Sequence, residues 1–175
     1  MFRRLSVKLE NISCVPELSG THVFLSLGSN LGDRKAYLRK ALSLLGEGGF
    51  SLEKVSSLYE TSPEGCEEGA KKFLNLVSSG FWKKDAHALL ALCKQAETAL
   101  GRPPDHPHWV SRVADIDILL FGEEKLFSET LTVPHPLALQ RRFVMEPLAE
   151  IAPDLIFPGT GKSCGELLRE LLRRG

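Results

Sequence analysis

Four apolar segments of the chain have the length and the residue types of buried β-strands. They combine aliphatic and aromatic side chains, and turn-forming residues lie near their ends. These segments are residues 22–28, 51–60, 73–82 and 114–122, and residues 125–133 predict one or two further short strands. The most strand-like of them, ADIDILLFG at 114–122, also contains two carboxylates, Asp115 and Asp117.

Apolar residues at helical spacing predict the helices, and polar residues mark where these begin. Asp33 and Asp85 each precede such a segment and can cap it. The expected helices are residues 34–46, 86–101, 143–153 and 163–174. The last begins with Ser163 and Glu166, which have the spacing of a capping box.

The strands and helices alternate irregularly along the chain. This order favours an α/β (α+β) sandwich with several antiparallel strand pairs over a strictly doubly wound parallel sheet. A length of 175 residues predicts one domain, which we assign to residues 21–175. Residues 1–20 are an appendage of mixed composition, and both a flexible arm and a short strand fit them.

Composition and charge narrow the class of protein. Hydrophobic residues make up 43% and charged residues 25%, and 22 Lys and Arg balance 22 Asp and Glu. No bulk charge favours nucleic acid or a membrane surface as a partner. The four cysteines are far apart and form no C-x-x-C pair, which argues against a zinc site and favours free thiols. Without a signal peptide or a long apolar run, the sequence predicts a cytoplasmic protein.

The two aspartates of the 114–122 segment are the main candidates for chemistry. Residues i and i+2 of a strand point to the same face, roughly 6.6 Å apart. Asp115 and Asp117 therefore project together, while Ile116, Ile118 and Leu120 are expected to anchor the strand in the core. Two unpaired carboxylates on one face repel, and a hard cation such as Mg²⁺ between them removes that penalty.

A solvated strand face with salt bridges is the alternative interpretation, and for an isolated D-x-D pattern it is the commoner one. Cationic residues flank this pair at Arg102, Arg112, His135 and Arg141. Their presence favours Mg²⁺ bound together with a polyphosphate, whose charge the metal and the arginines share. The segment GSNLGDR is not a Walker A loop, so a nucleotide must bind by another architecture.

Several longer motifs resemble those of one enzyme family. They are FLSLGSNLGDR (24–34), YETSP (59–63), FLNLV (73–77), LGR (100–102), DIDILLFG (115–122), LTVPHP (131–136) and RRFVMEPLAEIAPDLIFP (141–158). In this order, over about residues 22 to 172, the chain resembles 6-hydroxymethyl-7,8-dihydropterin pyrophosphokinase of folate biosynthesis. The resemblance implies a three-layer αβα sandwich with a ferredoxin-like, mostly antiparallel sheet. It also implies transfer of pyrophosphate from ATP to the pterin hydroxymethyl group, which leaves AMP.

The resemblance further implies roles for particular residues. Asp115 and Asp117 match the aspartates that bind two Mg²⁺ ions, and Arg102 and Arg112 match loop arginines that assist the transfer. The other expected ATP contacts are Glu97, Trp109, Ile118, His135 and Arg141. The expected pterin contacts are Thr61, Phe73, Asn75 and Phe143. Because this transfer needs positioning and charge neutralisation, we expect no protein nucleophile. We also expect a monomeric enzyme that binds only small molecules.

Two other function classes stay open at this point. One is a different Mg²⁺ enzyme that uses its D-x-D pair, such as a sugar-nucleotide transferase. The other is a non-catalytic ferredoxin-like binding module. Among the departures from the family pattern, Pro104 replaces a frequent arginine and Lys94 aligns with a glutamine.

Overall fold

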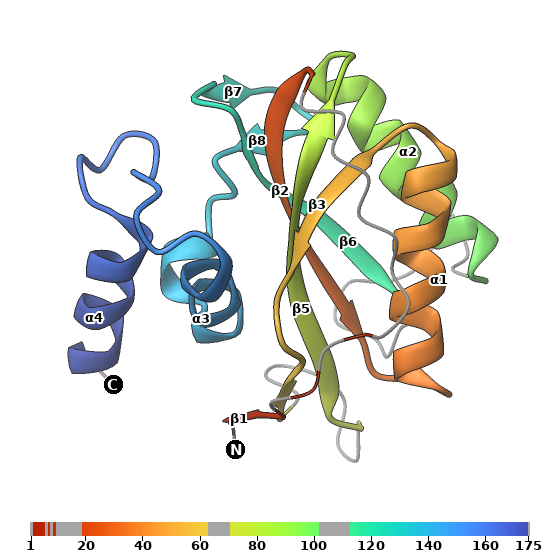
Figure 1. Ribbon diagram of the computed structural model, residues 1–175, viewed down its shortest axis with the longest axis horizontal. Coiled ribbons are helices and arrows are strands. Elements are labelled where there is room, and N and C mark those ends of the chain that lie inside the picture. The colour runs from red at the N-terminus through yellow and green to blue at the C-terminus, as the bar shows by residue number, and fades with distance from the viewer. Residues whose placement is uncertain are drawn as a thin grey trace.

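The fold is built on one main antiparallel sheet, with two long helices on one face and two shorter ones on the other, as a computed structural model shows (Figure 1). The structure describes residues 2–5, 7, 9, 19–62, 71–101 and 113–174. The strands of the main sheet are β1 (Phe2–Arg4), β2 (Thr21–Ser29), β3 (Ser51–Val55), β4 (Tyr59–Thr61), β5 (Phe73–Trp82) and β6 (Asp115–Phe121). The α-helices are α1 (Arg34–Glu47), α2 (Ala86–Ala99), α3 (Arg142–Ile151) and α4 (Cys164–Arg174).

The strands of the main sheet pair in the order β1-β4-β5-β2-β6, and β3 continues the edge formed by β4 alongside β5. All of these pairs are antiparallel. The path from β2 through α1, the β3–β4 edge, β5 and α2 to β6 is the ferredoxin-like arrangement that the sequence predicted. The second sheet is a hairpin of β7 (Leu126–Phe127) and β8 (Thr132–Val133), which follows β6 and precedes a short 3₁₀ helix, Ala138–Gln140.

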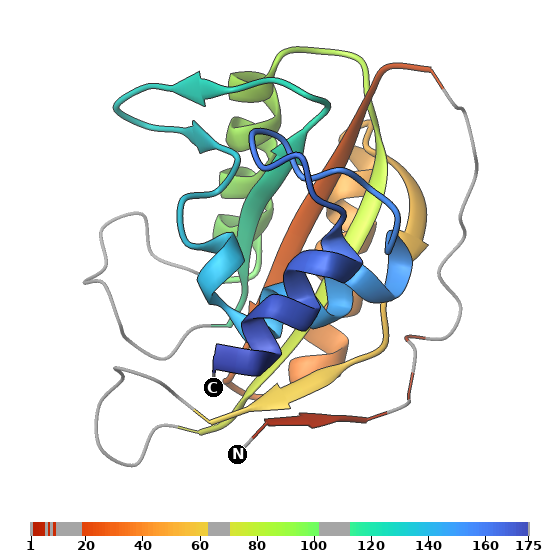
Figure 2. The ribbon, with the colours of Figure 1, turned by 90° about the vertical axis from the view of Figure 1, so that its left-hand side faces the viewer.

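Two apolar clusters, one on each face, hold the layers together. On one face, α1 and α2 pack on side chains such as Leu25, Leu76 and Ile116, and we call this cluster the α1–α2 core. On the other face, α3 and α4 pack on Phe24 and Val77, and we call this cluster the α3–α4 core. Figure 2 shows α3 and α4 crossing the sheet from this second side. The three-layer sandwich is thus confirmed.

The helix starts that the sequence predicted are also confirmed. Asp33 accepts a hydrogen bond from the amide of Ala36, and Asp85 accepts one from the amide of Ala88. Ser163 and Glu166 form the reciprocal capping box, since the amide of each donates to the side chain of the other, at 2.8 and 3.2 Å.

One predicted strand is wrong in its extent. Residues 51–60 do not form one strand, because Ser56–Leu58 separate β3 from β4. At the break, the Ser56 hydroxyl accepts a hydrogen bond from the Val77 amide at 3.0 Å, while the Ser56 amide donates to the Val77 carbonyl at 2.9 Å. The serine side chain thus takes the place of a backbone acceptor, and the regular ladder stops there.

A second correction concerns β6. Leu25 pairs with Ile118 and Phe24 pairs with Leu120, so Leu119 is the extra residue of a β-bulge. The bulge reverses the alternation, and Leu120 packs in the α3–α4 core instead of continuing the face of Ile116 and Ile118. Residues 1–20, for which the sequence left two interpretations, contribute the strand β1. Among the described residues, no helix is long and apolar enough to cross a membrane.

Candidate active site

The two aspartates of β6 lie at the edge of the main sheet. Ile116 and Ile118 point into the α1–α2 core and are buried. Asp115 and Asp117 alternate with them, are partly exposed, and therefore project from the opposite face. The predicted pairing of both carboxylates on one face is consistent with this geometry, and the buried isoleucines fix their spacing.

The surroundings of the pair disfavour two negative charges. Burial, and then the neighbouring charge of Asp115, raise the pKa of Asp117 above its ordinary value. The positive charges of Lys94 and Arg141 act in the opposite direction but do not outweigh these effects. Among the residues that the structure describes, no group of three or more His, Cys, Asp and Glu side chains could enclose a metal by itself. A two-carboxylate site fits a cation that takes its remaining ligands from water and substrate, as Mg²⁺ does.

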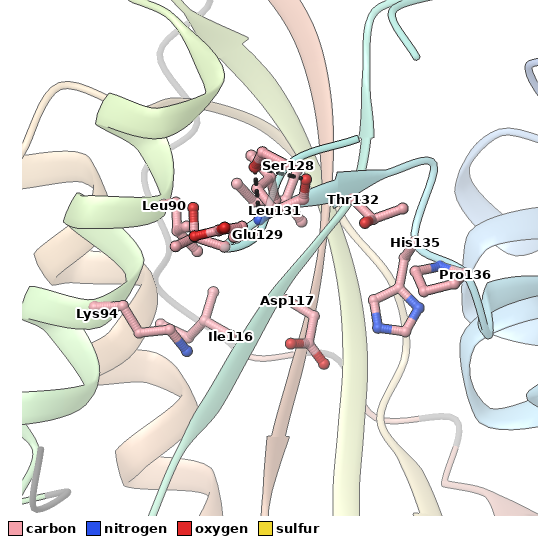
Figure 3. A pocket seen from close by; sticks show the side chains of 12 residues that line it. Leu90, Lys94, Ile116, Asp117, Ser128, Glu129, Leu131, Thr132, His135 and Pro136 are labelled. Carbon is pink, nitrogen blue, oxygen red and sulfur yellow. Dashed lines mark hydrogen bonds between the residues drawn. The ribbon is translucent and has the colours of Figure 1, made fainter. Parts of the chain in front are cut away.

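A cavity of about 300 Å³ opens beside Asp117 (Figure 3). It lies between α2, the outer edge of β6 and the β7–β8 hairpin. Leu90, Ile118 and Leu131 supply apolar walls, and Lys94, Asp117 and His135 supply charged and polar groups. Figure 3 shows the side chains of Asp117 and His135 among those that line the cavity. The volume is within the usual range for small-molecule sites.

His135 is held in a defined tautomer. Its amide donates to the Leu119 carbonyl at 2.9 Å, and its Nδ1 accepts a hydrogen bond from the Leu137 amide at 3.2 Å. Burial, and then the charge of Arg141, lower the pKa of the imidazole, so the ring is neutral at pH 7. Because Nδ1 accepts, the neutral ring carries its proton on Nε2. His135 can therefore donate a hydrogen bond to an anionic ligand.

Glu97 lies beneath the aspartate pair rather than in the cavity wall. It is 2% exposed, its Oε1 accepts a hydrogen bond from the Ile116 amide at 2.8 Å, and its Oε2 accepts one from Nζ of Lys94 at 3.0 Å. The Ile116 amide faces away from β2, on the outer edge of β6. Glu97 therefore fixes the backbone between the two aspartates.

Replacing Glu97 with alanine is expected to lower the free energy of unfolding by about 1–3 kcal/mol, because the Ile116 amide loses its acceptor. Glu97→Gln is the matched control, since its amide oxygen can still accept that hydrogen bond. Urea unfolding of both variants measures the difference. Equal losses of stability in the two variants would contradict the assigned role of the Ile116 contact.

A second group of side chains gathers across the middle of the same sheet face. Gly28 of β2 is paired with Asn75 of β5 on one side and with Asp115 of β6 on the other. Asn75 is buried, and its Nδ2 donates to the Thr61 hydroxyl at 3.0 Å. A Cβ atom at Gly28 would lie 2.9 Å from Oδ1 of Asn75 and 3.9 Å from the Phe73 ring. The amide oxygen of Asn75 therefore lies above Gly28, on the side of Asn75 that faces Asp115.

The start of α3 borders this group of residues. Arg141 lies 5.6 Å from the centre of the Phe143 ring, measured from its guanidinium carbon. Phe143 packs at the margin of the α3–α4 core, and α3 packs on β5. The predicted contacts Thr61, Phe73 and Asn75 therefore adjoin one another. Phe143 lies near the start of α3, the helix that packs on β5.

Three predicted residues, Arg102, Trp109 and Arg112, lie outside the described residues. Two others, Ile118 and His135, lie on the wall of the cavity. The cavity wall formed by Leu90 and by the turn of the β7–β8 hairpin was not predicted from the sequence. Leu90 and Lys94 are one helical turn apart, a spacing that could have placed them on one face of α2.

Comparisons with known proteins show the family of this chain. The profile of the 7,8-dihydro-6-hydroxymethylpterin-pyrophosphokinase (HPPK) family matches residues 24–153. The 2-amino-4-hydroxy-6-hydroxymethyldihydropteridine pyrophosphokinase of Bacillus subtilis is 46% identical over 133 residues, which are 75% of this chain and 78% of the relative. That of Aquifex aeolicus is 40% identical over 136 residues, covering 78% of this chain and 83% of the relative.

The solved structures support the fold. A crystal structure of Plasmodium falciparum HPPK-DHPS with pteroate matches 88% of this chain with a TM-score of 0.70 at 15% sequence identity. This chain spans 43% of that longer protein, so the likeness concerns the fold of one part of it.

Fold, site and relatives together define the class of this protein as a kinase-type transferase that moves a phosphate-containing group. Within that class, the chain belongs to the 7,8-dihydro-6-hydroxymethylpterin-pyrophosphokinase family. It is therefore a pyrophosphokinase, and membership of this family implies ATP as co-substrate. This membership excludes the two alternatives that the sequence left open, a sugar-nucleotide transferase and a non-catalytic binding module.

Proposed function

We propose that this protein transfers the β,γ-pyrophosphoryl group of ATP to the hydroxymethyl oxygen of 6-hydroxymethyl-7,8-dihydropterin with the help of Mg²⁺, releasing AMP in folate biosynthesis. One observation carries the proposal: the aspartate pair of β6 borders two sites at once. The cavity reaches Asp117 from the edge of the sheet, and the row of Asn75 and Gly28 reaches Asp115 across its face. A donor and an acceptor bound in these two places would meet at the carboxylates.

The cavity suits the adenosine of ATP. Leu90, Ile118 and Leu131 offer apolar surfaces to a flat base. The Ile116 amide faces outward from β6, as its bond to Glu97 requires, and by strand alternation the backbone of Ile118 faces the same way. The edge of an adenine base offers one hydrogen-bond donor and one acceptor, which a backbone carbonyl and a backbone amide on a strand edge can match.

The phosphates would extend from the cavity toward Asp117 and His135. Asp115 and Asp117 have the ligand chemistry for two Mg²⁺ ions, and a bound cation would relieve the repulsion that raises the pKa of Asp117. When bound, Mg²⁺ neutralises phosphate charge and favours ionisation of the attacking hydroxyl. His135 would donate from Nε2, and Arg141 would add positive charge. Arg102, Arg112 and Trp109, carried over from the family pattern, would complete the ATP contacts.

The pterin would lie over Gly28. Because Nδ2 of Asn75 is engaged with Thr61, its Oδ1 is left to accept from the N–H groups of the pterin's amide-like edge. Phe143 and Phe73 can pack against the bicyclic ring. The hydroxymethyl oxygen attacks the β-phosphorus, the bond from that phosphorus to the α,β-bridging oxygen breaks, and the electron pair leaves with AMP. The hydroxyl proton goes to solvent or to a phosphate oxygen.

The direct test mixes the protein with MgATP and 6-hydroxymethyl-7,8-dihydropterin and separates the nucleotide products by chromatography. We expect AMP in equal amount to the pterin pyrophosphate. Formation of ADP, or AMP formation that does not depend on the pterin, would contradict the proposal.

We further propose that residues 21–175 act as one domain, that the protein is a cytoplasmic monomer, and that it binds no nucleic acid. Gel filtration tests the monomer, and a DNA-binding assay tests the absence of nucleic-acid binding.

Substituting Gly28 with alanine is expected to raise the KM for the pterin about 10-fold or more, while the KM for ATP changes little. The reason is that the new Cβ would displace the Asn75 amide oxygen from its position over β2. Gly46→Ala, in α1, is the matched control, because a Cβ there meets no atom within 4 Å. Steady-state kinetics on both variants measure the effect, and an unchanged pterin KM in Gly28→Ala would refute the proposed place of the pterin.

A further inference from the structure

The N-terminal strand lies outside the part of the chain that matches the family, yet it joins the main sheet. β1 pairs with β4 in the register Phe2 with Thr61 and Arg4 with Tyr59. Beyond β1, the Leu5 amide donates to the Leu58 carbonyl at 2.8 Å. The Leu58 amide donates to the Val7 carbonyl at 3.0 Å. The strand therefore runs along the whole outer edge of β4, and Figure 2 shows the two side by side.

A polar cluster ties β1 to α3 as well. The carboxylate of Glu150, in α3, accepts hydrogen bonds from the amide and hydroxyl of Ser57 and from the Tyr59 hydroxyl, at 2.8 to 3.0 Å. Nη2 of Arg4 lies 3.2 Å from that carboxylate and 3.3 Å from the Ser57 hydroxyl. Burial would raise the pKa of Glu150, but the bonds from Tyr59 and Ser57 and the charge of Arg4 together hold it below its ordinary value. The cluster is thus an ionised carboxylate with donors on several sides.

Phe2 makes the second connection. Its ring lies 5.6 Å from the Tyr59 ring, between ring centres, and the guanidinium carbon of Arg142 lies 4.5 Å from the centre of the Phe2 ring. Arg142 directly precedes Phe143, and Phe2 is paired with Thr61. β1 therefore contacts both segments that carry proposed pterin contacts, the end of β4 and the start of α3.

We propose that Phe2 and Arg4 are positioning residues for the pterin site. β4 is three residues long, so its pairing with β5 alone is a weak constraint on Thr61 at its end. β1 supplies the second neighbour, and the contacts of Phe2 and Arg4 hold β4 at a fixed distance from α3. This inference rests on the proposed function, because it assumes that Thr61, Asn75 and Phe143 contact the pterin.

The test compares Arg4→Ala with Arg3→Ala in the full chain. Both changes remove one exposed arginine from the same strand, and of the two it is Arg4 that makes the Glu150 contact. We expect Arg4→Ala to raise the KM for the pterin about 10-fold, with kcat and the KM for ATP within 2-fold of the unaltered chain. Arg3→Ala is expected to change none of them. Arg4→Lys keeps the charge and should restore part of the pterin affinity.

A second variant and a second measurement separate positioning from general loss of stability. Phe2→Ala leaves the Glu150 ion pair intact and is also expected to raise the pterin KM alone. In both positioning variants, hydrogen exchange of the Leu58 amide should accelerate, because its acceptor is the Val7 carbonyl. The inference would be overturned if kcat fell and the KM values for the pterin and for ATP changed by the same factor. A pterin KM equal to that of Arg3→Ala would overturn it as well.

The same experiment distinguishes this inference from the proposed function. If the proposed function is wrong, the unaltered chain makes no pterin-dependent AMP. If only the positioning role is wrong, the unaltered chain is active and Arg4→Ala and Phe2→Ala behave like Arg3→Ala.

Discussion

Replacing Asp117 with asparagine will reduce pterin-dependent AMP formation by on the order of 1,000-fold, without unfolding the protein. The substitution keeps the shape of the side chain but removes the charge that would hold Mg²⁺ near the ATP phosphates. The measurement is kcat/KM for both substrates, with Mg²⁺ varied. Asp154→Asn, in the exposed turn after α3, is the matched control and should retain full activity.

The stability of Asp117→Asn tests whether the negative charge of Asp117 is unfavourable in the folded protein. Burial and the charge of Asp115 raise the pKa of Asp117 in the folded state, so at pH values between the unfolded-state and folded-state pKa the folded protein keeps a proton that the unfolded chain has released. This difference destabilises the native state above the unfolded-state pKa, reaches its full size above the folded-state pKa, and vanishes as the pH falls below both. In Mg²⁺-free buffer, Asp117→Asn should therefore unfold at higher urea concentration than the unaltered protein at pH 7. This advantage should shrink as the pH approaches 4. A variant that is less stable at pH 7 would show that Asp117 is held by favourable contacts instead.

Asn75→Ala is expected to lower kcat/KM for the pterin about 100-fold or more and to leave ATP binding nearly unchanged. The change removes the proposed acceptor for the pterin edge and leaves the buried Thr61 hydroxyl without the Asn75 donor. A buried site that has lost its hydrogen-bonding partner discriminates strongly against a polar ligand. Pterin titration, followed by calorimetry in the presence of a non-hydrolysable ATP analogue, measures the affinity directly.

Ser79→Ala is the matched control for this variant. Ser79 lies four residues along the same strand and on the same face, but its hydroxyl donates to Glu53 at the far end of the sheet. Ser79→Ala should change neither the affinity nor the kcat/KM for either substrate. Equal effects of the two variants would indicate a general disturbance of β5 rather than loss of a pterin contact.

Much of the fold could be predicted from the sequence because the signals are local. An aspartate before a helical segment and the serine–glutamate spacing before α4 each depend on a few adjacent residues, and the hydrogen bonds that they predict are present. The D-x-D pair is also a local signal, since the pleat of one strand places both carboxylates on one face. The motifs then added the family, and the curated relatives confirm it.

The rest of the site depends on pairing between strands that are distant in sequence. Nothing near Gly28 in the sequence shows that β2 lies between β5 and β6, so the row from Asn75 over Gly28 to Asp115 appears only in the folded sheet. The bulge at Leu119, which reverses the face of Leu120, likewise depends on the register with β2.

The sequence by itself therefore determined most of the elements, the carboxylate pair and the family of this protein. The tertiary structure decided that the pair borders both the cavity and the row over Gly28, that Glu97 supports β6 from below, and that β1 closes the edge beside Thr61. The physical reason is that caps and strand alternation are set by neighbours along the chain. Sheet order, register and the approach of α3 are set by which apolar faces can be buried together.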